Sequence, residues 1–190
     1  MFDKSKYLQT IVHASCSIGE IESSASKAFK IDDNDGIAQA IGFHAGMVNK
    51  VDYFVANNND IQLIELSDLE ESIQNCHVYI ERELKQLREF KGGDITIRDE
   101  SKIIKAAWKD IKVEFCKKWS GSIAVIERLY RKTSELGDDA DPSYKLLIVC
   151  KDHTDIKMLD ALKGQLLGMM GNVEVCKTKT LSNALIGSAL

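Results

Sequence analysis

Two acidic residues, Asp52 and Glu65, lie in neighbouring segments whose composition favours β-structure. The segments 50–55 and 61–66 are separated by a run of Asn and Asp, which tolerate the left-handed backbone of tight turns. We therefore predict a β-hairpin. Acids on adjacent antiparallel strands can approach each other, and paired carboxylates suit Mg²⁺, which takes oxygen ligands and keeps several waters. Such a cation activates water and stabilises charge on a phosphodiester.

The neighbours of the two acids are apolar. Strict alternation places Asp52 on the same strand face as Phe54, and places Glu65 on the same face as Ile61 and Leu63. A carboxylate on a core-facing surface is unfavourable unless a partner or a cation compensates it. The alternative interpretation is that both acids are ordinary charges on the solvent side of a half-buried hairpin.

This hairpin resembles that of the PD-(D/E)XK nuclease superfamily, which places an Asp on one strand and an acidic-X-Lys triplet on the next. The resemblance implies a restriction-endonuclease-like core, hydrolysis of DNA or RNA phosphodiesters, and Mg²⁺ or Mn²⁺ as the cofactor. It also implies that Asp52 and Glu65 are catalytic metal ligands. Glu20, which we expect on a first helix, matches an additional acid that many members carry there.

The chain departs from the family pattern at the lysine, because Ser67 occupies that position, and at the preceding proline, where Val51 stands. Ser67 also has a structural explanation, as the N-cap of a helix with Glu70 completing a capping box. The departure leaves open a catalytically degenerate protein. It also leaves open a lysine supplied from elsewhere in the chain. The candidates are Lys50, Lys102, Lys117 and Lys118.

Basic residues concentrate in a segment predicted to be helical, between residues 112 and 132. Arg128 lies three positions before Arg131 and four before Lys132, so these side chains share a helical face. Together with Trp119 and Tyr130 they could contact a phosphate backbone. The alternative is a solvated helix face, since acids interrupt the charge. The predicted nucleic-acid contacts are Lys117, Lys118, Arg128, Arg131 and Lys132.

The elements that must position these residues form a mixed sheet with helices on its faces, in the α/β to α+β range. Helical periodicity predicts a helix over 5–29 and long helices over 68–135, with Asp99 or Ser101 as a cap and a bend near Ser120-Gly121. A nearly continuous apolar run, 144–150, predicts a strand covered on both faces. A helix capped by Thr154 or Asp155, a strand over 173–176 and a short closing helix over 181–190 complete the pattern.

The long helical middle supports a second hypothesis. A binding or accessory subunit, of the inhibitor or immunity type found in defence systems, would present these helices to a protein partner or to a second copy of the chain.

Length and composition set outer limits on both hypotheses. The 190 residues suit one domain, 1–190. The net charge of −4 lacks the basic excess typical of a nucleic-acid binder, but it does not exclude one. No apolar stretch is long enough for a transmembrane helix and no signal peptide is recognised, so we expect a cytoplasmic protein without membrane contact. The five cysteines are scattered and lack a CxxC pair, which argues against a disulfide framework.

Overall fold

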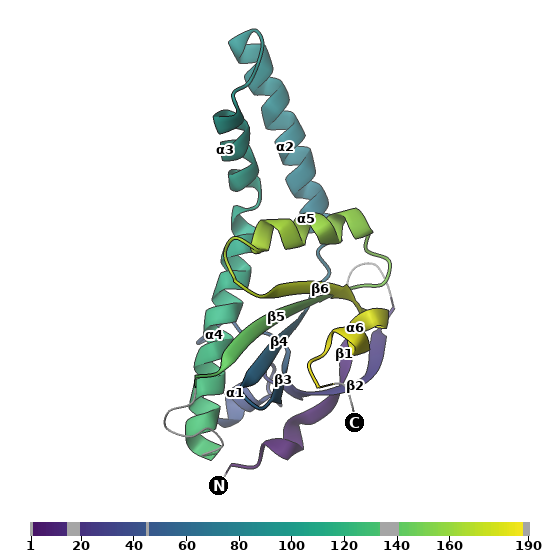
Figure 1. The fold of residues 1–190 in the computed structure, drawn as a ribbon, viewed down its shortest axis with the longest axis vertical. Coiled ribbons are helices and arrows are strands. Elements are labelled where there is room, and N and C mark those ends of the chain that lie inside the picture. The colour runs from purple at the N-terminus through teal and green to yellow at the C-terminus, as the bar shows by residue number, and fades with distance from the viewer. Residues whose placement is uncertain (1, 15–19, 45, 134–140, 188–190) are drawn as a thin grey trace.

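In the computed structural model, six strands form one mixed sheet in the order β1-β2-β3-β4-β5-β6 (Figure 1). The structure describes residues 2–14, 20–44, 46–133 and 141–187. Strands β1 to β4 pair antiparallel, whereas β4, β5 and β6 are parallel. The predicted mixed α/β architecture is confirmed. The strands are β1 (Leu8–His13), β2 (Glu22–Lys30), β3 (Tyr53–Asn57), β4 (Asp60–Leu66), β5 (Ser143–Cys150) and β6 (Val173–Lys177).

Helices occupy most of the chain between β4 and β5. In Figure 1 α2 and α3 form a hairpin that projects away from the sheet, and α4 returns alongside it. The α-helices are α1 (Ile37–Ala40), α2 (Glu70–Lys91), α3 (Ile97–Ala107), α4 (Lys109–Thr133), α5 (Ile156–Leu166) and α6 (Leu181–Ala184), and 3₁₀ turns cover Lys4–Tyr7 and Thr178–Thr180. In the part of the chain that is described, no helix combines the length and apolarity that crossing a membrane requires.

Both faces of the central strands are buried. Leu63 of β4 belongs to the main core, which α4 and α5 share, whereas its neighbour Ile64 belongs to a second cluster. That second cluster packs β4 and β5 against Ile11 and Ala28 of the β1–β2 hairpin and against Leu181 of α6. The nearly continuous apolar run of β5 follows from this arrangement, as predicted, because the strand has no solvent-facing side.

The predicted helix over 5–29 is wrong. The structure has β1 and β2 there, paired antiparallel, with Leu8 opposite Phe29. Burial in β1 alternates, since Ile11 and His13 are buried while Val12 between them is exposed. The apolar residues of β1 therefore follow the two-residue period of a β-strand. Their helical spacing is coincidental, and the central part of the predicted helix, 15–19, lies outside the described residues.

The first residues of α2 and α3 differ from those predicted. Helix α2 begins at Glu70 after Leu69, with no side-chain cap. Helix α3 begins after Thr96, whose hydroxyl accepts from the Asp99 N–H, so the cap lies before both predicted residues. Asp155 caps α5 as predicted, by accepting from the Lys157 N–H.

The structure also bears on three other predictions, which concern the bend in the long helices, the closing helix and the cysteines. Helix α4 is continuous through Gly121, so the predicted bend there is absent. The closing helix is limited to 181–184, and 188–190 lie outside the described residues. The described cysteines, Cys76, Cys116, Cys150 and Cys176, are free thiols, and Cys16 lies outside the described residues.

Candidate functional site

The register of the β3–β4 hairpin brings the two candidate carboxylates together. Tyr53 pairs with Ile64, so Asp52, immediately before β3, lies opposite Glu65 in β4. A hydrogen bond also ties Asp52 to β4, since the Leu66 N–H donates to Asp52 Oδ2 at 2.7 Å. Asp52 is half-buried and Glu65 is only 2 % exposed. The site is therefore an acidic pair set into the helix-covered face of the sheet.

The two oxygens of Glu65 have different surroundings. Oε1 accepts from the Ser67 hydroxyl at 3.0 Å and from the ammonium of Lys118. Oε2 is buried and has no hydrogen-bond partner among the described residues. A buried carboxylate oxygen without a partner is costly in free energy. One oxygen of the pair is thus left without a hydrogen-bond partner from the described part of the chain.

Burial disfavours the charged form of both acids. Desolvation, reinforced by the negative charge of Asp52, raises the pKa of Glu65 to about 7 although Lys118 and Ser67 act in the opposite direction. Desolvation also raises the pKa of Asp52, against the Leu66 N–H and the Lys118 charge. Perturbed carboxylates of this kind cluster at functional sites. Burial, and in Glu65 also the neighbouring negative charge, therefore outweighs the positive charge of Lys118 at this pair.

Of the four lysines considered, Lys118 of α4 is the one that reaches the acidic pair. Its ammonium contacts Glu65 and lies 3.3 Å from Glu114 on the same helix, and its side chain is 22 % exposed. Burial opposes its charge, but the two carboxylates outweigh burial and raise its pKa. The ammonium therefore stays charged beside Glu65.

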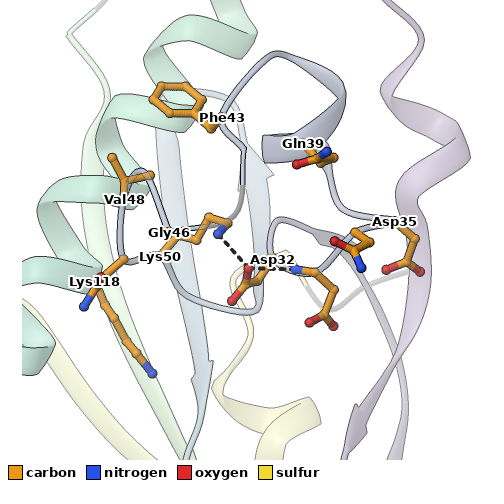
Figure 2. A pocket seen from close by; sticks show the side chains of 11 residues that line it. Asp32, Asp35, Gln39, Phe43, Gly46, Val48, Lys50 and Lys118 are labelled. Atoms are coloured by element: carbon orange, nitrogen blue, oxygen red, sulfur yellow. Dashed lines mark hydrogen bonds and ion pairs between the residues drawn. The ribbon is translucent and has the colours of Figure 1, made fainter.

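The other three lysines are placed elsewhere. Lys50 pairs with Asp32, Nζ to Oδ1 2.7 Å (Figure 2). Lys117 is exposed on α4, and Lys102 is exposed on α3 in the projecting hairpin.

Ser67 does not act as the predicted N-cap. Helix α2 begins three residues later, and the Ser67 hydroxyl points back to Glu65 instead. The Ser67 hydroxyl donates to a buried carboxylate, a strong hydrogen bond, and α2 begins without a side-chain cap. Ser67 thus belongs to the site, at the position where the resemblance expects a lysine.

Glu20 lies in the connection before β2, so its predicted place on a helix is wrong. It is exposed, and its backbone carbonyl accepts from the fully buried Lys151 at 2.7 Å. The contact thus fastens Glu20 to the end of β5 and not to the acidic pair. Its role as a third metal ligand has no support in this arrangement.

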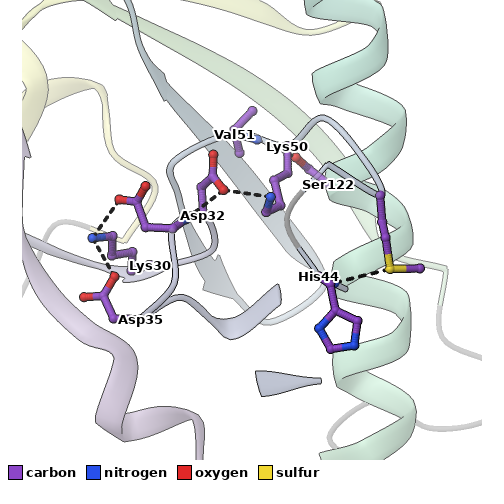
Figure 3. Close-up of polar contacts among 9 residues, drawn as sticks. Lys30, Asp32, Asp35, His44, Lys50, Val51 and Ser122 are labelled. Atoms are coloured by element: carbon purple, nitrogen blue, oxygen red, sulfur yellow. Dashed lines mark hydrogen bonds and ion pairs between the residues drawn. The ribbon is translucent and has the colours of Figure 1, made fainter. Parts of the chain in front are cut away.

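The segment that leads to Asp52 is fixed against α4 beside Lys118. The Val51 N–H donates to the Ser122 hydroxyl at 2.9 Å (Figure 3). A Cβ on Gly121 would lie 1.9 Å from the Asn49 carbonyl oxygen, so only glycine permits this approach. Gly121 and Ser122 are three and four positions after Lys118, on one face of the helix. The same helical face therefore holds both the Asp52 segment and the lysine.

The predicted basic face divides into two groups. Lys118 faces the acidic pair, and the Arg128 guanidinium lies over the ring of Phe43, 5.2 Å from its centroid. Arg128 itself is exposed, as are Lys117, Arg131 and Lys132. Their contact with nucleic acid stays a prediction.

The two aromatic residues of this region belong to the main core or pack against it. Trp119 meets Tyr144 edge-on at 6.4 Å, and Tyr130 is buried in the main core. Tyr130 is therefore not presented to a phosphate backbone, whereas Trp119 is only partly buried.

No group of three or more His, Cys, Asp or Glu side chains suited to a metal occurs within the described ranges. Two carboxylates are nevertheless enough for Mg²⁺, which completes its shell with water and phosphate oxygens. Comparison of the chain with family models, with curated proteins and with solved structures finds no match.

Proposed function

We propose that this protein hydrolyses phosphodiester bonds in DNA or RNA with a divalent cation, Mg²⁺ or Mn²⁺, held by Asp52 and Glu65. The observation that carries the proposal is the buried, unpartnered Oε2 of Glu65 beside a second carboxylate. The Leu66 N–H occupies Asp52 Oδ2, which leaves Oδ1 for the cation. Such a cation lowers the pKa of a bound water and offsets negative charge on the phosphate.

The chain's own groups have distinct tasks in this proposal. Lys118 stays charged next to Glu65 and supplies the positive charge that the family pattern places at position 67. Positive groups aimed at developing phosphate charge contribute strongly to catalysis. Ser67 orients Glu65 by holding Oε1, so that Oε2 is directed to the cation. A cytoplasmic location and nucleic acid as the partner belong to the same proposal.

The test is cleavage of plasmid and oligonucleotide substrates with Mg²⁺ or Mn²⁺, and with EDTA as the blank. Asp52→Asn and Glu65→Gln should abolish cleavage, and Lys118→Met should reduce it by roughly 10²-fold or more. The matched control is Lys102→Met, which removes an exposed lysine on α3 in the projecting hairpin and should leave cleavage unchanged.

Calorimetric titration with Mn²⁺ separates binding from catalysis. Binding should be lost in Asp52→Asn and Glu65→Gln and kept in Lys118→Met. Metal binding without any cleavage would refute hydrolysis and favour a degenerate protein. Absence of both would refute the site itself.

A second candidate function, a binding subunit that works through its helices, is favoured by the tip of the α2–α3 hairpin. Phe90 near the end of α2 and Ile97 at the start of α3 are 87 % and 86 % exposed. No residue of α3 is buried. Large apolar side chains presented together mark interaction surfaces. Size-exclusion chromatography with light scattering would test it: a dimer that Phe90→Ser and Ile97→Ser convert to monomer supports this function, whereas a monomer without a copurifying partner opposes it.

A further inference from the structure

A cleft of about 670 Å³ adjoins the acidic pair. It is bounded by the loop after β2, by the segment that precedes β3, and by α4 (Figure 2). Lys118 lines this cleft and also contacts Glu65, so one side chain borders both the cleft and the acidic pair. The volume lies within the range of roughly 300–1,000 Å³ that is usual for small-molecule sites. A group bound here would lie next to whatever the carboxylates hold.

The lining combines an aromatic ring with groups that make hydrogen bonds. Phe43 borders the cleft, and the Arg128 guanidinium stacks over its ring. The exposed amides of Gln39 and Asn49 offer both donors and acceptors. A nucleobase presents the matching features, because it has a π-face for stacking and an edge of donors and acceptors.

The aspartates that line the cleft are paired with lysines, which reduces their repulsion of a phosphate. Lys30 pairs with Asp33 and Asp35 at 3.0 Å and 2.9 Å, and Lys50 pairs with Asp32. Their oxygens still accept hydrogen bonds from the amino groups of a base. The ammonium groups on the lining belong to Lys50 and Lys118, and the latter lies on the side of the acidic pair. A phosphate beside Lys118 and a base beside Phe43 would therefore occupy different parts of the cleft.

We infer that this cleft receives the base of one unpaired nucleotide, adjacent to the phosphodiester at Asp52 and Glu65, and that the substrate is single-stranded nucleic acid. The inference rests on the proposed function. A base within an intact duplex is stacked and paired, so it cannot enter a cleft unless it is flipped out. Single-stranded DNA and single-stranded RNA share this chemistry, and the test distinguishes them.

The experiment measures binding of fluorescent 12-nucleotide probes by anisotropy, in Glu65→Gln protein without added metal, so that no cleavage occurs. The probes are single-stranded DNA, single-stranded RNA and a blunt DNA duplex. We expect at least tenfold tighter binding of one or both single strands than of the duplex. Phe43→Ala should weaken single-strand binding about tenfold, as loss of one stacked base does. Phe90→Ala removes an exposed ring on the distant hairpin and should change nothing.

A surface variant keeps the test decisive if Phe43→Ala unfolds. Gln39 is exposed, so Gln39→Ala should fold normally while it alters the order of affinity among homopolymer probes. Equal affinity for single strands and duplex would overturn the inference, as would wild-type binding in both Phe43→Ala and Gln39→Ala. If metal-dependent cleavage persists with those results, only the substrate assignment fails. If no probe binds and no substrate is cleaved, the proposed function fails as well.

Discussion

Glu65→Gln should remove most of the pH dependence of stability that the metal-free protein shows between pH 5 and 8. In the folded state desolvation and Asp52 raise the pKa of Glu65 to about 7, whereas its ordinary value is 4.5. The folded protein therefore holds a proton on Glu65 that the unfolded chain has already released. Stability is greatest below the ordinary pKa and falls as pH rises towards 7.

The size of the effect follows from the two pKa values. Each pKa unit corresponds to about 1.36 kcal/mol, so the loss between pH 4.5 and 7 amounts to about 3 kcal/mol. Glutamine keeps the shape of the side chain and does not titrate, so its variant lacks this loss. Some dependence of the same sign remains, because burial also raises the pKa of Asp52. His13 acts in the opposite sense, since burial and the charge of Lys151 lower its pKa.

The assay is urea unfolding in EDTA at half-unit steps from pH 5 to 8, for the wild type and the variant. The difference between the two free energies of unfolding cancels the contribution of His13. The control is Glu114→Gln, which removes the other carboxylate beside Lys118, one that is 54 % exposed. That control should retain the wild-type pH dependence.

Two results would refute the reasoning. One is an identical pH slope in wild type and Glu65→Gln, which would mean that the carboxylate is not stabilised in its protonated form. The other is a slope of opposite sign, with stability rising towards pH 8. Addition of Mn²⁺ offers a further check, because a bound cation favours the ionised carboxylate and should flatten the wild-type slope.

Three more predictions concern the supports of the site. Gly121→Ala forces a Cβ against the Asn49 segment and should destabilise by about 1–3 kcal/mol in urea unfolding, whereas Gly164→Ala, in open space on α5, should be neutral or stabilising by up to about 1 kcal/mol. Lys151→Met leaves two backbone carbonyls beside the β1–β2 connection without their ammonium and should cost about 1–3 kcal/mol, whereas an unchanged urea midpoint would contradict this network. Lys118→Met combined with Ser67→Lys should recover part of the lost cleavage, and complete inactivity of the double variant with wild-type Mn²⁺ binding would show that the lysine's position on α4 is essential.

Local signals in the sequence were sufficient for the hairpin that carries the site. The turn chemistry of Asn and Asp and the alternation around Asp52 and Glu65 predict two strands, and they leave open whether the acids face the core or the solvent. The register then places the acids opposite each other, and Glu65 is buried. These features depend on neighbours within about fifteen residues, which is why the sequence pattern contains them.

The remaining features depend on contacts between distant segments. Ser67 is a local exception, because it has every mark of an N-cap, yet its hydroxyl donates to Glu65 two residues earlier and α2 begins without a side-chain cap. Gly121 in a predicted helix suggests a bend, but the glycine instead admits the Asn49 carbonyl to the helix surface. Lys118 lies 53 positions after Glu65, and only the packing of α4 selects it from the four candidate lysines.

The arrangement around Lys118 also explains how one site could tolerate serine at position 67. A lysine on a strand beside Glu65 would bring its own long side chain into the core, with the entropy loss that ordering it entails. Here the ammonium comes from a helix that is already fixed by Gly121 and Ser122 against the Asp52 segment. The short serine side chain leaves room for that ammonium and holds the same oxygen of Glu65. Because both groups bind Oε1, Oε2 stays unpartnered, and under the proposed function this arrangement would keep the positive charge and the open ligand position that phosphodiester hydrolysis needs.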